Sequence, residues 1–210
     1  MLLRAQADFT TVIIAFIVMV MALIFHNIVQ AFVANKLGDP SPRLAGFMAF
    51  DPQRQLDLIG VVFLLLLGFG WPRTIPTNSR NYGNRGRAEG WVWLAGIGAY
   101  LLVAFVSLLV GAVFLRMGSQ PLFAAFWLAA QTALLHAVIN LFPILPLDMA
   151  RAALAWGNAD VRRLVMQVAQ FGVLGFMVFF FVLSATGVIS RIMNFFAGVF
   201  LRIISLIPGL

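Results

Sequence analysis

A long segment without charge near the start of the chain limits what this sequence can form. Residues 10–33 contain no lysine, arginine, aspartate or glutamate and are almost entirely apolar. A helix needs about 20 such residues to cross a bilayer, so this segment is predicted to span a membrane. Over the whole chain 62% of residues are hydrophobic and only 10% are charged, which excludes an ordinary soluble domain. The length of 210 residues suits a single membrane domain over residues 1–210.

Further apolar segments predict an all-α integral membrane protein, a polytopic helical bundle with about five to six membrane segments. The other expected spans are residues 91–115, 121–142 and 161–187. Residues 188–207 either span the membrane or lie in its interface as an amphipathic helix. Residues 58–71 are too few for a full crossing, and we expect a short or re-entrant element there. Short β-strands are expected in the region 40–80.

The basic residues predict the orientation of the chain. The formal net charge of +7 would suggest nucleic acid in a soluble protein, but basic residues also concentrate in the cytoplasmic loops of membrane proteins. In the arrangement above, ten basic residues lie on one side: Lys36, Arg43, Arg54, Arg73, Arg80, Arg85, Arg87, Arg151, Arg162 and Arg163. Three lie on the other: Arg4, Arg116 and Arg191. We therefore expect a multi-pass protein of a prokaryotic inner membrane with cytoplasmic basic loops, in contact with lipid and other membrane proteins or transmembrane helices, and no nucleic acid.

A polar cluster interrupts the first apolar segment. Polar side chains are costly inside a membrane, so His26, Asn27 and Gln30 mark a candidate site. On a helix His26 and Gln30 project from one face, as the two histidines of His-Glu-x-x-His do when they bind zinc. Asn27 occupies the position of the catalytic glutamate, and an amide does not accept a proton at neutral pH. Gln30 occupies the position of the second histidine, and a carboxamide is a poor zinc ligand.

A second polar motif gives the sequence its resemblance to a known family. Residues 140–148 read Asn-Leu-Phe-Pro-Ile-Leu-Pro-Leu-Asp. This run resembles the Asn-Leu-x-Pro-Ile-Pro-Pro-Leu-Asp-Gly signature of the site-2 protease family of intramembrane zinc metalloproteases. Residues 37–40 and 68–78 resemble two further stretches of that family. The resemblance implies a family core over about residues 10–156, followed by C-terminal membrane helices over about residues 161–207.

The resemblance also implies which residues would carry the chemistry. His26 and Asp148 match two zinc ligands of the family, whereas Asn27 and Gln30 replace the catalytic glutamate and the second histidine. Met149 and the run 95–100 also depart from the family pattern. We therefore interpret the chain as a catalytically inactive pseudoprotease that has no catalytic residue, needs no cofactor and leaves its metal position empty. It would act as a scaffold, an accessory subunit of a membrane complex or a binder of client helices, with Asn140, Pro143 and Pro146 as candidate groove residues.

Alternative readings stay open from the sequence. In one, the chain is an active intramembrane zinc metalloprotease that binds zinc through His26, Asp148 and either Gln30 or His136. In another, it is a small transporter or channel subunit. His26 can also be hydrogen-bonded within the bundle, and Asn140 can join two helices. We expect Asp148 to pair with Arg151 one helical turn later.

Overall fold

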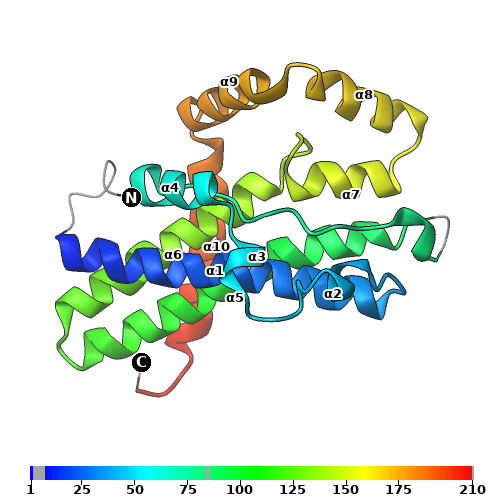
Figure 1. Ribbon diagram of the computed structural model, residues 1–210. Coiled ribbons are helices and arrows are strands. Elements are labelled where there is room, and N and C mark those ends of the chain that lie inside the picture. The colour runs from blue at the N-terminus through cyan, green and yellow to red at the C-terminus, as the bar shows by residue number, and fades with distance from the viewer. Residues whose placement is uncertain (2–7, 84–85, 210) are drawn as a thin grey trace.

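The computed structural model describes residues 1, 8–83 and 86–209, and in this part of the chain four helices are long and apolar enough to cross a membrane. These helices are α1 (Phe9–Lys36), α5 (Glu89–Arg116), α6 (Gln120–Asn140) and α10 (Val188–Ser205). Helices α1, α5 and α6 lie side by side, and α10 crosses them while packing against α6 and α5 (Figure 1). The chain is thus a multi-pass membrane protein.

Shorter helices connect and flank these spans. They are α2 (Ser41–Leu44), α3 (Pro52–Gln55), α4 (Leu58–Leu67), the 3-10 helix η1 (Ser79–Asn81), α7 (Asp148–Trp156), α8 (Ala159–Ala169) and α9 (Gly172–Ala185). Figure 1 shows α7 running out beside the start of α5, and α8 and α9 turning back above it. Helix α7 packs against α5, which places its first turn beside the polar part of α1.

Small residues allow α1, α5 and α6 to approach one another closely. Fully buried alanines on α1 and α6 are Ala15, Ala31, Ala34, Ala125, Ala129, Ala130, Ala133 and Ala137. In a membrane such residues favour helix association, because close backbones gain dispersion contacts that lipid tails do not offer. Asp8 begins α1 by accepting a hydrogen bond from the backbone N–H of Thr11 at 2.9 Å.

The expectation of strands in the region 40–80 is wrong. No strand occurs among the described residues; the region forms α2, α3, α4 and η1, with one isolated bridge between Leu56 and Pro72. Aspartate caps explain this difference. Asp51 and Asp57 accept hydrogen bonds from the backbone N–H groups of the first turns of α3 and α4, and so start helices. Helix α4 ends at Gly68 in the left-handed conformation after only ten residues, which confirms a short element.

The expected span over 161–187 is also wrong. The chain turns at Gln170 and Phe171, which separates α8 from α9, and neither helix is long enough to cross a membrane. The turn needs a positive φ at Gly172 (55°), which glycine adopts without steric cost. The described part therefore has four candidate spans rather than five or six, and α10 is one of them.

Candidate functional site

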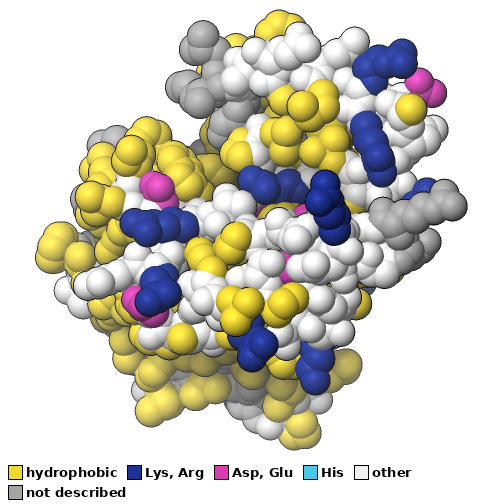
Figure 2. Space-filling view, turned by 45° about the vertical axis from the view of Figure 1, so that its right-hand side comes forward, with side chains coloured by type: hydrophobic (Ala, Val, Ile, Leu, Met, Phe, Trp, Pro, Cys, Tyr) yellow, Lys and Arg dark blue, Asp and Glu magenta, His cyan; other side chains and the backbone are white. Residues whose placement is uncertain are grey.

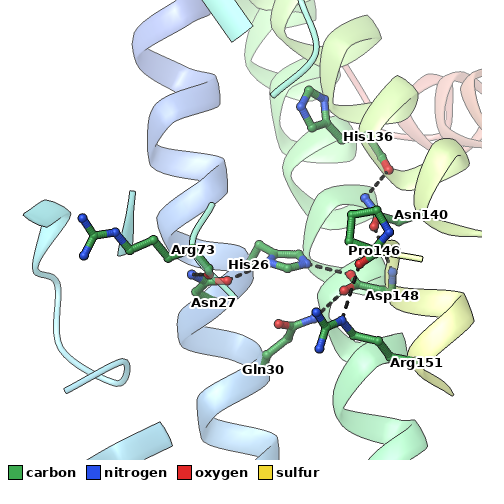
Figure 3. Close-up of polar contacts among 9 residues, drawn as sticks. All are labelled: His26, Asn27, Gln30, Arg73, His136, Asn140, Pro146, Asp148 and Arg151. Atoms are coloured by element: carbon green, nitrogen blue, oxygen red, sulfur yellow. Dashed lines mark hydrogen bonds and ion pairs between the residues drawn. The ribbon is translucent and has the colours of Figure 1, made fainter. Parts of the chain in front are cut away.

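Three polar side chains predicted from the two motifs meet between α1, α5 and α7 (Figure 3). His26 Nε2 lies 2.8 Å from Asp148 Oδ2, and Gln30 Nε2 donates a hydrogen bond to Asp148 Oδ1 at 3.1 Å. Each of the three is at most 6% exposed. The two motifs are far apart in the sequence but meet in space, because α7 begins at Asp148 and packs against α5, which in turn packs against α1. The structure therefore brings the two motifs into one buried cluster.

The second nitrogen of His26 is also engaged. Its Nδ1 lies 3.1 Å from Asn27 Oδ1. The Asn27 amide is oriented by its own donor, because Nδ2 donates to the carbonyl of Arg73 at 2.8 Å, so Oδ1 is the atom that faces the histidine. Which ring nitrogen donates and which accepts depends on the tautomer of His26. In the folded chain each of the two nitrogens faces a side-chain oxygen of the cluster.

Asn27 connects α1 to the segment after α4. Its amide donates to the carbonyl of Arg73 and, at 3.4 Å, to that of Gln55. The Arg73 N–H in turn donates to the Gln55 carbonyl at 2.8 Å. Gln55 is completely buried, and its side chain donates to the carbonyls of Phe47 and Ala49. Asn27 therefore acts as a structural donor, and the sequence gave no signal for its partner Gln55.

The predicted ion pair between Asp148 and Arg151 is wrong. The structure shows no such pair among the described residues, and Asp148 contacts His26 instead. The Arg151 guanidinium lies over the ring of Trp93, 4.8 Å from its centroid, and its Nε donates to the Pro146 carbonyl at 3.4 Å (Figure 3). The first turn of α7 directs the carboxylate into the bundle, whereas the next turn directs the arginine toward the start of α5.

Gly96 and Tyr100 on α5 form the wall of the cluster. A Cβ at Gly96 would overlap Gln30 Nε2, and would lie 2.5 Å from His26 Nε2 and 2.9 Å from Asp148 Oδ2. The ring of Tyr100 stacks on His26 with centroids 4.6 Å apart. Both residues belong to the run 95–100 that departs from the family pattern. The sequence therefore marked this run as unusual, but it did not predict that the run packs against His26.

The structure does not bring His136 into the cluster. Its Nδ1 lies 2.7 Å from the Thr132 carbonyl, and its Nε2 accepts a hydrogen bond from the Gly70 N–H at 3.2 Å. Figure 3 shows the ring of His136 apart from His26 and Asp148. The neutral imidazole uses both nitrogens in these contacts, so His136 serves to hold the segment after α4 against α6.

Asn140 joins α6 to α7. Its Nδ2 donates to the His136 carbonyl at 2.9 Å, and its Oδ1 accepts from the Asp148 N–H at 3.2 Å. The second bond satisfies a backbone N–H in the first turn of α7, which has no partner within its own helix. Pro143 and Pro146 are exposed on the intervening loop. A groove role for these three residues stays a prediction.

A second polar centre, which the sequence analysis did not identify, lies outside the spans. The fully buried Asp39 accepts hydrogen bonds from Ser41, from the Asn78 N–H at 2.8 Å and from Asn81 Nδ2 at 2.8 Å. Burial opposes the charged form, but these hydrogen bonds outweigh it and lower the pKa of Asp39 to about 2. The Asp39 carboxylate thus connects the end of α1 by hydrogen bonds to the loop that contains η1.

The residues of the cluster do not fit a hydrolytic zinc centre. Such a centre uses three strong protein ligands and a base that activates water. Among the described residues no three His, Cys, Asp or Glu side chains lie together. Gln30 presents its NH₂ group to Asp148, and Asn27 donates hydrogen bonds rather than accepting a proton. The cluster can hold α1, α5 and α7 together through the contacts of His26 with Asp148 and Tyr100 and of Gln30 with Asp148.

Comparison with known proteins gives one relative. The chain is 29% identical over 173 residues to "Putative zinc metalloprotease YwhC" of Bacillus subtilis (strain 168), and the match covers 78% of each chain. No protein-family model and no solved structure matches the chain. The resemblance seen in the two motifs therefore extends to most of the sequence. The chain is a multi-pass membrane protein that is distantly similar, over most of its length, to this bacterial protein.

Proposed function

We propose that this chain is a non-catalytic relative of site-2 proteases, a pseudoprotease that acts as a membrane scaffold or accessory subunit. The observation that carries this proposal is the environment of His26. Both of its nitrogens face side-chain oxygens, one on Asp148 and one on Asn27. An imidazole in that position stabilises the bundle through hydrogen bonds instead of offering a lone pair to a metal.

The position of the one glutamate, away from the cluster, supports the same proposal. Glu89 is the single glutamate of the chain. Its carboxylate accepts hydrogen bonds from the hydroxyl groups of Thr77 at 2.7 Å and Ser79 at 2.6 Å, in the loop before α5. It lies about two helical turns before Gly96, the residue that touches the cluster. Loss of a positioned base typically lowers a rate by about 10²- to 10⁴-fold.

Exposed apolar side chains provide the surface for membrane partners. On α1 and α5 these include Ile17, Met21, Phe32, Trp91, Leu102 and Val106. Either lipid tails or the transmembrane helix of a partner can cover such faces. A partner helix is favoured where it packs more closely against them than lipid does. The exposed loop with Pro143 and Pro146 lies directly before Asp148 and is the place where a client segment would approach the cluster.

Site-specific crosslinking tests whether membrane partners are bound and left intact. A photo-crosslinking amino acid would be placed at position 143 or 146 of the full chain in cells, with position 117 at the opposite end of α5 as the exposed control. We expect adducts with intact membrane proteins from 143 or 146 and few from 117. Equal adducts from all three positions would contradict a specific binding loop.

Profiling of new peptide termini tests the catalytic alternative, in which His26, Asp148 and Gln30 bind zinc. Membranes from cells that produce the natural chain would be compared with those that produce Asp148→Asn, at matched protein levels. The proposal predicts the same termini in both. Fragments that are present with the natural chain and absent with the variant would show proteolysis and would overturn the proposal.

A further inference from the structure

A pocket on the basic side of the molecule is separate from the His26 cluster. It has a volume of about 320 Å³ and lies between the loop before α5, the first turns of α5, and α7 and α8. The polar and aromatic residues that line it are Ser79, Glu89, Trp93, Arg151 and Arg162. Figure 2 shows a face of the molecule on which Lys and Arg side chains are numerous. Arg85, which the sequence analysis grouped with these basic residues, lies outside the described residues.

Arg151 is a half-buried cation without a carboxylate partner in the described structure. Its contacts there are the stacking on Trp93 and one long hydrogen bond to the Pro146 carbonyl. A guanidinium has five N–H donors, so most of its hydrogen-bonding capacity is directed elsewhere. Arg162 lines the same pocket from α8, and the described residues give its guanidinium no hydrogen bond or ion pair. Two arginines with open donors match the oxygens of a phosphate.

The one acidic residue of the pocket is already satisfied. Both oxygens of Glu89 accept hydrogen bonds from hydroxyl groups, one from Thr77 and one from Ser79. The pocket thus combines two arginines with a single glutamate whose charge is engaged by its own loop. Its net charge is positive, which favours an anion over a cation.

Tryptophans and apolar side chains place the pocket at the level of lipid headgroups. Trp91, one turn into α5, is 59% exposed and packs edge-on against Trp156 with ring centroids 5.2 Å apart. Tryptophan concentrates at membrane–water interfaces. Leu154 and Ala155 line the pocket together with the two arginines and provide apolar surface for the first part of an acyl chain.

The walls of the pocket are fixed before any ligand binds. The Trp156 indole N–H donates to the Arg87 carbonyl at 2.9 Å, which ties the end of α7 to the start of α5. Gly90 allows this approach, because a Cβ there would overlap the Trp156 ring. A fixed site loses little conformational freedom on binding. From these observations we propose that the pocket binds the phosphate of an anionic phospholipid through Arg151 and Arg162, with the lipid chain beginning against Leu154.

Thermal unfolding of the full chain in mild detergent tests the proposal, with phosphatidylglycerol or phosphatidylcholine added at equal mole fraction. We expect phosphatidylglycerol to raise the Tm by several degrees more than phosphatidylcholine. Native mass spectrometry of the same samples should show retained phosphatidylglycerol. Because a charged hydrogen bond to a phosphate is lost with each arginine, Arg162→Gln and Arg151→Gln should each weaken retention about tenfold or more. Arg116→Gln, at the exposed opposite end of α5, is the matched control and should retain the lipid.

Separate outcomes would overturn the proposal. These are equal stabilisation by the two lipids, or full retention of phosphatidylglycerol by the Arg151→Gln, Arg162→Gln chain. Glycerol phosphate that gives the same arginine-dependent shift would identify a free phosphate as the ligand instead of a lipid. An acidic peptide that binds while the lipid does not would identify a protein partner. Arg162 is exposed, so Arg162→Gln keeps the test valid if Arg151→Gln fails to fold. Neither substitution alters His26 or Asp148, so this outcome is independent of whether the chain is catalytic.

Discussion

Asn27 provides the sharpest test of the proposal that its position serves the structure and not catalysis. The substitution Asn27→Leu keeps a similar volume and introduces no charge. It removes the amide that donates to the Arg73 carbonyl at 2.8 Å and the oxygen that faces His26 Nδ1 at 3.1 Å. The Gln55 carbonyl keeps a donor, because the Arg73 N–H also binds it. One buried atom, His26 Nδ1, and one partly buried atom, the Arg73 carbonyl oxygen, would then lose these partners.

The expected cost comes mainly from the buried His26 Nδ1. An unsatisfied buried donor or acceptor costs about 1–3 kcal/mol, so the substitution should destabilise the fold by at least about 1–3 kcal/mol. Asn27 is 1% exposed, so water does not replace the partner that His26 loses. A chain of this size loses about 2–4 °C in Tm for each kcal/mol, which predicts a decrease of at least about 2 °C.

Two measurements on the purified chain check this prediction. Tryptophan fluorescence on heating gives the Tm, and amide hydrogen exchange reports whether the Arg73 N–H loses protection. Asn35→Leu is the control, because Asn35 lies two turns later on α1 and makes no side-chain hydrogen bond in the described structure. An unchanged Tm together with unchanged exchange at Arg73 would refute the structural role of Asn27.

Three further predictions concern the surroundings of the cluster. Gly96→Ala should cost about 1–3 kcal/mol or more, because its Cβ meets three side chains of the cluster, whereas Gly98→Ala meets nothing within 4 Å and should be neutral or stabilising in the same thermal assay. Asp39 has a folded pKa of about 2 against an ordinary 3.8, so its carboxylate stabilises the fold by about 2 kcal/mol above pH 4 and this contribution is lost as pH falls from about 4 to 2. The Tm difference between the natural chain and Asp39→Asn should therefore shrink over that range; a constant difference would contradict the assignment. His136→Phe should lower the Tm and increase exchange at the Gly70 N–H, because it removes that amide's acceptor, while leaving the metal content unchanged.

The membrane part of the fold was predictable where apolar segments are long and unbroken. Helices α1, α5 and α6 lie where the segments 10–33, 91–115 and 121–142 predicted them. The segment 161–187 is apolar only in its second half, because α8 contains Arg162 and Arg163, and the chain turns between the halves with a positive φ at Gly172. The helices in the region 40–80 depend on side-chain caps such as Asp57, which outweigh the strand-forming residues that follow.

The candidate site was predictable in its membership and less so in its contacts. Helical spacing placed His26 beside Gln30, and the second motif supplied Asp148, which the structure brings into contact with both. The prediction that Asp148 pairs with Arg151 was wrong, because the direction of α7 depends on its packing against α5. No local sequence pattern reveals that packing. The role of Gln55 could not be predicted, because its side chain binds backbone carbonyl groups that come together only in the folded chain.

The ratio of zinc to protein tests the central claim most directly. The natural chain would be purified in mild detergent without chelator and measured by mass spectrometry, beside a chain with Asn27→Glu and Gln30→His, which has the His-Glu-x-x-His pattern. The account predicts far less than one zinc per natural chain, and zinc only in the restored chain. About one zinc per natural chain, lost with Asp148→Ala, would contradict it and would make His26, Gln30 and Asp148 a working metal site.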